Sequence, residues 1–297
     1  MNKDKKRIIT YLAIVFGVYY SFWLVGLLVP DDTAQMVYSI LSFPLIFMGT
    51  PVLAAAITRK VTKDDSPWRL SLKVWKHPKM FFFSAFVPTA AILLGAILFY
   101  VIFPNDLDYA GRYIVENFSA YGAPSEISMN VRSMLVMGVI VWLISAVCFP
   151  IWFIALGEDM GWQGYFLPLL LKHMPVRCAV LLNGALWGLA HAPLIYFGMN
   201  YDKDYAGAPF SGIAMMVVVC IVLGIWMSYV NLKTGNCMYA GIIHGAVDII
   251  GEVPVWLSLS TQSTLLGPNP TGIIGMSVLV VGAIILLWKM PKEMACE

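Results

Sequence analysis

The chain is a succession of long apolar runs separated by short polar segments. A bilayer core about 30 Å thick is crossed by about 20 apolar residues in a helix. Eight segments are long and apolar enough: Ile8–Val29, Gln35–Thr58, Phe81–Phe103, Met134–Leu156, Cys178–Gly198, Ser211–Tyr229, Met238–Trp256 and Thr271–Trp288. The pattern predicts an all-α polytopic membrane protein of about eight transmembrane helices, with residues 1–297 forming one membrane domain.

The composition supports this prediction. Hydrophobic residues make up 60% of the 297 residues and charged residues only 12%. A soluble domain does not hide that much apolar surface. The first apolar run follows a basic flank and precedes no convincing cleavage site, so we interpret it as a retained anchor.

The basic residues predict the orientation of the chain. With the N-terminus in the cytoplasm and eight spans, sixteen of the nineteen Lys and Arg residues fall on the cytoplasmic side, and only Arg112, Arg132 and Lys203 fall outside. Cytoplasmic loops carry an excess of Lys and Arg. We therefore expect both termini in the cytoplasm of a cell, which we take to be bacterial, with the protein in its plasma membrane. The net charge of +2 reflects this orientation and does not indicate a nucleic-acid partner.

One segment does not divide evenly into spans. Between Arg132 and Lys172 lie 39 residues, which are too many for one upright span and too few for two. A single helix of that length would extend about 58 Å. We expect either a long tilted helix or a span followed by a half-helix along the inner face, with Pro150 and Pro168 as points where it kinks.

Ionisable residues are concentrated in the second half of the chain. The first three spans contain none, whereas the fourth to seventh spans and their borders contain Glu158, Asp159, His191, His244, Asp248 and Glu252. An ionisable residue within a membrane span costs about 2.5–3.5 kcal/mol on insertion scales and marks a functional site by default. A purely structural role remains the alternative for each residue taken singly.

The spacing of these residues groups them on helix faces. Glu158 and Asp159 are adjacent, so they point about 100° apart on a helix and do not form a carboxylate pair by themselves. Trp187 and His191 are four residues apart on one face, and Asn183 lies on the same stripe. His244 and Asp248 have the same spacing. Two small-xxx-small pairs, Gly184 with Gly188 and Gly241 with Gly245, predict close packing of both histidine-bearing helices.

The order of these motifs resembles that of the CAAX protease and bacteriocin-processing (CPBP, or Abi) family. The family pattern is EExxxR, then FxxxH, then HxxxN or HxxxD, on successive helices of an eight-helix membrane core. This chain has Glu158-Asp159 followed by Gln163, then Trp187 with His191, then His244 with Asp248. The segment from Gly161 to Pro168 also resembles the GWRGYLLP context of bacterial members. The resemblance predicts a catalytic core over residues 134–252.

The resemblance implies an intramembrane endopeptidase and a role for each motif residue. Its catalytic residues would be Glu158 as the base that activates water, His191 as the residue that holds the water, and His244 as the oxyanion stabiliser oriented by Asp248. Asp159, Gln163 and Trp187 would support them. The substrate would be a membrane-associated peptide or lipidated protein, either prenylated at a CAAX-type end or related to bacteriocins.

Four departures from the family residues bear on activity. Asp159 replaces a Glu, Trp187 replaces a Phe, and Gln163 replaces an Arg that could neutralise the second acid. Asp248 stands in place of an Asn, whose amide could donate to an oxyanion, whereas a carboxylate donates only when protonated. These changes leave open a non-catalytic peptide-binding or bacteriocin self-immunity protein of the same fold. A proton-coupled transporter is a further alternative, because intramembrane acids and histidines also serve as proton relays.

The cofactor is also open from the sequence. We expect no required cofactor, although His191, His244 and Glu158 are the residue types of a Zn²⁺ site with one position left for water.

Overall fold

The computed structural model describes residues 3–112, 131–145 and 149–291, and these residues form an all-helical protein. The predicted fold class is therefore confirmed. Among the described residues, six helices are long and apolar enough to cross a membrane, and two shorter apolar helices, Leu135–Ile144 and Ser277–Lys289, accompany them. Together they account for the eight predicted spans.

Most predicted spans correspond to one helix or to two helices in succession. The α-helices outside the fourth span are α1 (Lys3–Gly26), α2 (Asp32–Ser42), α3 (Thr50–Thr62), α4 (Pro78–Ile102), α9 (Val176–Ala190), α10 (Ala192–Tyr196), α11 (Phe210–Thr234), α12 (Met238–Glu252) and α13 (Ser277–Lys289). A π-helix, η1 (Phe43–Phe47), joins α2 to α3, and short 3₁₀ turns occur at Val74–Lys76, Pro104–Asp106 and Val255–Leu257.

The segment that did not divide evenly into spans is built from several pieces. It contains α6 (Val131–Ser145), α7 (Phe149–Gly161), the π-helix η4 (Trp162–Phe166) and α8 (Leu167–Leu170). Pro168 lies in the first turn of α8. Helix α8 follows directly on η4, and the backbone of Phe166 and Leu167 is helical, so the chain runs through α7, η4 and α8 without leaving the helix. The chain thus continues past Glu158 and Asp159 in a widened π turn, a feature often found at functional sites.

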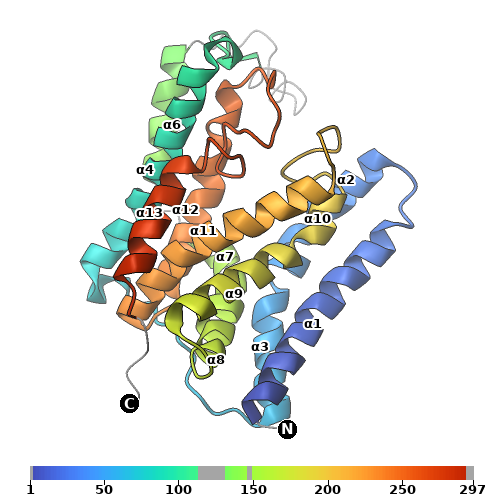
Figure 1. Cartoon of the computed structure of the whole chain (residues 1–297), viewed down its shortest axis with the longest axis vertical. Coiled ribbons are helices and arrows are strands. Elements are labelled where there is room, and N and C mark those ends of the chain that lie inside the picture. The colour runs from blue at the N-terminus through green and yellow to red at the C-terminus, as the bar shows by residue number, and fades with distance from the viewer. Residues whose placement is uncertain (1–2, 113–130, 146–148, 292–297) are drawn as a thin grey trace.

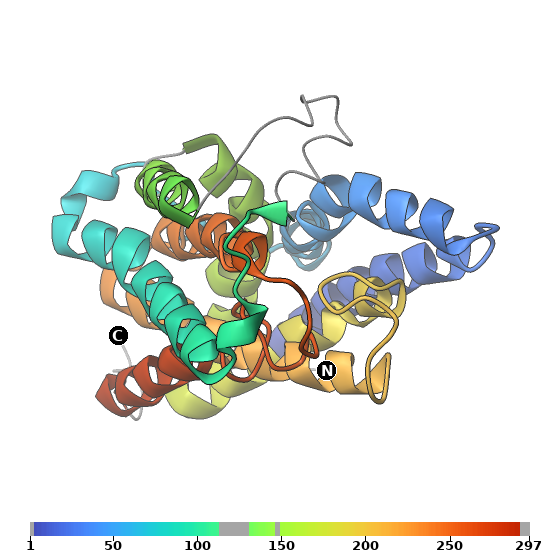
Figure 2. The ribbon, with the colours of Figure 1, turned by 90° about the horizontal axis from the view of Figure 1, so that it is seen from above.

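The helices form two groups with α12 between them. In Figure 1, α4, α6 and α13 stand on one side and α1, α2 and α3 on the other, and the view from above in Figure 2 shows the same division. Helix α12 contacts α4, α6, α7 and α11, and α9 packs along α11. This central position surrounds the middle of α12, where His244 lies, with protein on several sides.

Charged residues divide the molecule into two ends. The end at the bottom of Figure 1, called the basic end, is formed by the start of α1, the segment between α3 and α4, the turn between α8 and α9, and the ends of α11 and α13. By sequence these segments carry fifteen basic residues: Lys3, Lys5, Lys6, Arg7, Arg59, Lys60, Lys63, Arg69, Lys73, Lys76, Lys79, Lys172, Arg177, Lys233 and Lys289. The opposite end, called the acidic end, is formed by the segment between α1 and α2, the segment after α4, the start of α6, the loop between α10 and α11, and the end of α12. By sequence these segments carry Asp31, Asp32, Asp106, Asp108, Asp202, Asp204 and Glu252, with Arg112, Arg132 and Lys203 as their basic residues.

Contacts at each end confirm this grouping. At the basic end, Arg7 Nε lies 3.2 Å from Asp64 Oδ2, and Lys172 Nζ lies 3.7 Å from Asp4 Oδ1, so α1 is tied to segments distant in sequence. At the acidic end, the backbone N–H of Leu259 donates to the carbonyl of Asp106 at 2.8 Å. The segments predicted to be cytoplasmic therefore meet at one end of the fold.

The outer surface of the helices is apolar. Leu45, Val101 and Phe210 are 79%, 71% and 78% exposed, and many other large hydrophobic residues on the outer helix faces are also exposed. Soluble monomers rarely expose such continuous apolar surface. An apolar surface of this kind is suited to contact with the hydrocarbon core of a lipid bilayer.

Candidate active site

Two glycines place Glu158 and Asp159 deep in the structure. A Cβ atom built on Gly157 would lie 2.6 Å from the carbonyl oxygen of Met48, and one built on Gly161 would lie 2.4 Å from Pro51 Cβ. Helix α7 therefore approaches the start of α3 more closely than any side chain allows. This Gly157-xxx-Gly161 pair brackets the two acids and fixes their helix against its neighbour.

Both acids are buried, and one histidine lies between them. Glu158 and Asp159 are each 1% exposed. Nδ1 of His244 lies 3.2 Å from Asp159 Oδ2, and its Nε2 lies 4.0 Å from Glu158 Oε2. Although the two carboxylates point in different directions from α7, the His244 ring from α12 faces both.

Asp248 occupies the exposed side of the same ring. Its Oδ2 lies 3.7 Å from His244 Nε2, and its side chain is 46% exposed. The hydrogen bond that orients the His244 ring in this structure therefore comes from Asp159, while Asp248 contributes charge at longer range.

Trp187 connects α9 directly to the acid on α7. Its indole Nε1 donates a hydrogen bond of 2.8 Å to Glu158 Oε1. The other carboxylate oxygen, Oε2, is buried without a hydrogen-bond partner. Glu158 is thus held at one oxygen and left free at the other, which faces the His244 side.

The orientation of His191 is set by its own helix. Its Nδ1 lies 2.9 Å from the backbone carbonyl oxygen of Trp187. Because a carbonyl oxygen only accepts hydrogen bonds, Nδ1 carries the proton, and a neutral ring then presents Nε2 as an acceptor. A water molecule is the kind of ligand that such a nitrogen holds.

A cavity of about 290 Å³ adjoins these residues. Its wall includes Trp187, His191, His244, Asp248 and Glu252. Glu158 lies directly behind this wall, in contact with Trp187 and near His244. The remainder of the wall is mainly apolar and comes from η1, α11 and the loops at the acidic end.

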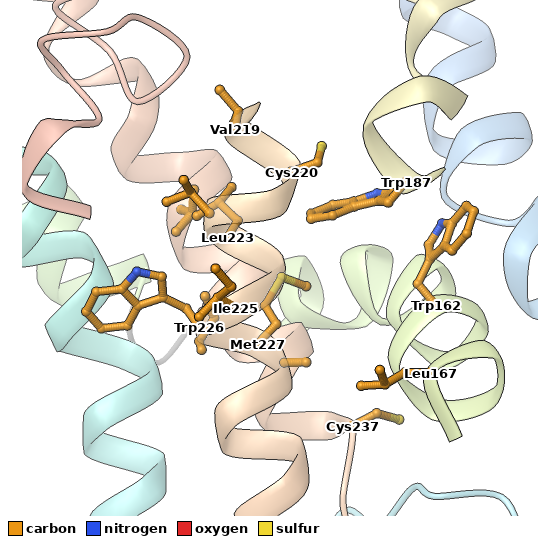
Figure 3. Close-up of a cluster of buried hydrophobic side chains, with 14 of the residues drawn as sticks. Trp162, Leu167, Trp187, Val219, Cys220, Leu223, Ile225, Trp226, Met227 and Cys237 are labelled. Atoms are coloured by element: carbon orange, nitrogen blue, oxygen red, sulfur yellow. The ribbon is translucent and has the colours of Figure 1, made fainter. Parts of the chain in front are cut away.

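Helix α11 supplies much of the apolar surroundings. Figure 3 shows Trp187 extending from α9 toward α11, next to Cys220 and Leu223. The Trp187 ring also meets the His191 ring at 5.8 Å and the His244 ring at 5.3 Å between centroids, both edge to face. Both histidines are therefore packed against one rigid aromatic side chain.

Gln163 lies farther along the same helical segment, and its contacts are with α11. Its Oε1 accepts a hydrogen bond of 3.0 Å from Ser228 Oγ, and its backbone carbonyl accepts one of 2.7 Å from Asn231 Nδ2. The Gln163 Nε2 is buried without a partner. Gln163 therefore fixes the π turn to α11, and no hydrogen bond joins it to Asp159 among the described residues.

The predicted close packing of the histidine-bearing helices is observed on α9. A Cβ built on Gly184 or Gly188 would lie 2.7 Å from Ile221 Cα or 2.5 Å from Val217 Cα, both on α11. On α12, a Cβ built on Gly241 would lie 3.2 Å from a side-chain carbon of Leu156. These approaches pack α9 closely against α11, and α12 against the α7 helix that carries the two acids.

His191, His244 and Glu158 are residue types that bind zinc in other proteins. In the part of the chain that the structure describes, no three His, Cys, Asp or Glu side chains meet in an arrangement that could hold a metal ion. The side chains as placed do not fit a zinc centre of His191, His244 and Glu158.

The motif region matches a known family. The family model described as type II CAAX prenyl endopeptidase Rce1-like matches residues 134–250. This match confirms the predicted resemblance. The Rce1-like region contains both acids, both histidines, Trp187, Gln163 and Asp248. No curated protein matched the chain.

The Rce1-like match supports an intramembrane protease of the CAAX type, and therefore a peptide-bond hydrolase. Together with the long apolar helices, it identifies the chain as an integral membrane protein.

Sequence reasoning missed the residues that hold the motif in place. Ser228 and Asn231, which bind Gln163, are polar side chains three residues apart in an apolar helix. Gly157 and Gly161 have the same small-xxx-small spacing that was recognised on the histidine-bearing helices. Both pairs could have been found in the sequence, since polar residues and paired glycines in apolar helices indicate contacts between helices.

Proposed function

We propose that the chain is an intramembrane endopeptidase that hydrolyses a peptide bond with a water molecule activated by Glu158. The observation that carries the proposal is the state of this carboxylate. It is buried, held at Oε1 by Trp187, unpartnered at Oε2, and next to a histidine that lines the cavity. A buried acid in this position needs a function to offset its cost.

The proposed reaction assigns one step to each side chain. Water held by Nε2 of His191 loses a proton to Glu158 as its oxygen attacks the peptide carbonyl carbon. His244 donates to the oxyanion that forms, and Asp159 and Asp248 stabilise the charge on its ring. The C–N bond then breaks, and Glu158 returns the proton to the leaving amine.

No obligatory metal belongs to this proposal. Among the residues that the structure describes, no three potential metal ligands converge, and Glu158 with two histidines supplies a base and an oxyanion donor without a metal. Retained cleavage after exhaustive chelation is the expected result. Loss of cleavage on chelation and its recovery on adding Zn²⁺ would refute this part of the proposal.

The same residues suggest how the protein lies in the membrane. The basic end collects the segments expected in the cytoplasm, and cytoplasmic loops are enriched in Lys and Arg. We place both termini in the cytoplasm and the chain in a bacterial plasma membrane. The substrate class is a membrane-associated peptide, such as a prenylated CAAX-type end or a bacteriocin-related precursor.

One observation favours a second candidate, a peptide-binding or self-immunity protein. Gln163 carries no charge and makes no hydrogen bond to Asp159, so nothing at this position neutralises that acid as the family arginine could. A protein with this departure could retain the cavity and capture a peptide without cleaving it.

Peptide cleavage by the purified protein in detergent separates the two candidates. The wild type would be incubated with a mixed library of lipidated and unmodified peptides, and the products would be identified by mass spectrometry. Cleavage at defined bonds is the expected result. A stable peptide complex with no products, from protein that remains folded, would favour the binding function.

A further inference from the structure

Among the described residues, the loops that line the cavity beside the catalytic residues lie at one end of the molecule. Besides the site residues, the cavity wall contains Met199 and Asn200 from the loop after α10. It also contains Asn269, Pro270 and Thr271 from the loop before α13. These two loops contact each other, since Tyr201 Oη donates to the Thr271 carbonyl and Thr264 Oγ1 to the Tyr201 carbonyl. Both loops belong to the acidic end (Figure 1).

The path toward the basic end is closed by packed side chains. Beyond Glu158 and Asp159 the chain continues as η4 and α8, and almost all of the segment Trp162–Leu170 is buried. Gln163, Ser228 and Asn231 are all at most 1% exposed and link this segment to α11. A separate pocket, lined by Arg59, Arg69 and Lys172 among others, lies on the far side of that segment and shares no lining residue with the catalytic cavity.

The charges at the two ends give this cavity a direction in the membrane. Fifteen basic residues lie at the basic end, whereas three lie at the acidic end. Lys and Arg near the ends of spans are retained on the cytoplasmic side. The end whose loops line the cavity is therefore the extracytoplasmic end.

We propose that the catalytic cavity is filled from the extracytoplasmic side of the membrane by a peptide segment on that outer face. The identity of this segment as a substrate rests on the proposed function, but its route of entry does not. The proposal narrows the substrate class. It favours secreted or externally anchored peptides over the C-terminal ends of proteins that remain in the cytoplasm.

Access is measured most directly with one added cysteine at each end, in a chain that keeps its own five cysteines. Glu252 lines the cavity, is exposed and belongs to the acidic end, so Glu252→Cys reports on the cavity. Lys76 is exposed at the basic end, and Lys76→Cys is the matched control. Each variant is treated with a membrane-impermeant sulfonated maleimide in right-side-out and in inverted membrane vesicles. Labelling is counted as the excess over the unsubstituted protein.

The expected result is excess labelling of Glu252→Cys in right-side-out vesicles only, and of Lys76→Cys in inverted vesicles only. Labelling of Glu252→Cys in inverted vesicles alone would overturn the proposal. So would labelling of both variants from the same side, or no labelling of folded Glu252→Cys from either side.

The labelling test does not require catalysis. A protein that labels as expected but cleaves no peptide would refute the proposed function and leave the route of entry intact. Cleavage of peptides in detergent, together with labelling of Glu252→Cys in inverted vesicles only, would support the proposed function and refute the route of entry.

Discussion

Trp187 contacts the site in two separable ways, and replacing it with Phe removes only one of them. The indole Nε1 donates to Glu158 Oε1 at 2.8 Å, while the ring packs edge to face on His191 and His244. Phenylalanine keeps an aromatic ring and removes the donor. Glu158 then loses the contact that fixes its carboxylate and has two buried oxygens without partners.

The expected loss follows from the strength of that contact. A hydrogen bond to a charged group contributes about 1.5–3 kcal/mol. If the contribution is needed to position Glu158 in the transition state, kcat falls about 10- to 150-fold, at about 1.36 kcal/mol for each factor of ten. The Michaelis constant should change little, because the ring that lines the cavity is kept.

Steady-state cleavage of a quenched fluorescent peptide in detergent measures both constants. Trp226→Phe is the matched control, since the Trp226 Nε1 donates at 3.0 Å to the carbonyl of Leu279, remote from the acids. Both variants should lose similar thermal stability, whereas only Trp187→Phe should lose activity. A kcat for Trp187→Phe within twofold of wild type, or an equal loss in the control, would refute the positioning role.

Three further predictions concern packing, pH and metals. Gly161→Ala should destabilise the protein by about 1–3 kcal/mol in thermal unfolding, because its Cβ collides with Pro51, whereas Gly17→Ala, which meets nothing within 4 Å, should be neutral or stabilising. Burial tends to raise the pKa of the Asp64 carboxyl, but hydrogen bonds from Ser66 and the charges of Arg7 and Arg59 hold it below the usual 3.8. The folded protein therefore gains stability from ionised Asp64 above about pH 4. The stability advantage of wild type over Asp64→Asn, measured as a difference in melting temperature, should be present at pH 7 and disappear as the pH falls through the lowered pKa. An advantage that persists unchanged at pH 3 would contradict this. Finally, cleavage should persist after dialysis against a strong chelator, with the metal content followed by mass spectrometry.

The apolar runs predicted the fold well because a membrane span depends on length and composition alone. Most of the predicted spans coincide with helices to within a few residues. The segment around Glu158 was predicted less completely. Its π turn contacts α3 and α11, and such contacts between distant segments are not visible in the spacing of the apolar runs.

In the candidate site too, contacts within one helix could be predicted from the sequence, whereas contacts between distant segments could not. The i, i+4 pairs indicated that Trp187 and His191 share a face, and the structure brings both toward the acids. The pattern around His244 favoured Asp248 as its partner because that residue is nearby in sequence. The hydrogen bond goes instead to Asp159, 85 residues away, which only the packing of α7 on α12 could place there.

The central claim is that Glu158 activates the water that cleaves the peptide bond. Its most direct test is the kcat of Glu158→Gln, which keeps the shape of the side chain and removes the base. Asp65→Asn, an acid-to-amide change at an exposed position at the basic end, is the control. We expect Glu158→Gln to lose about 10²- to 10⁴-fold in kcat while it still binds the peptide. A Glu158→Gln protein as active as wild type would contradict the account.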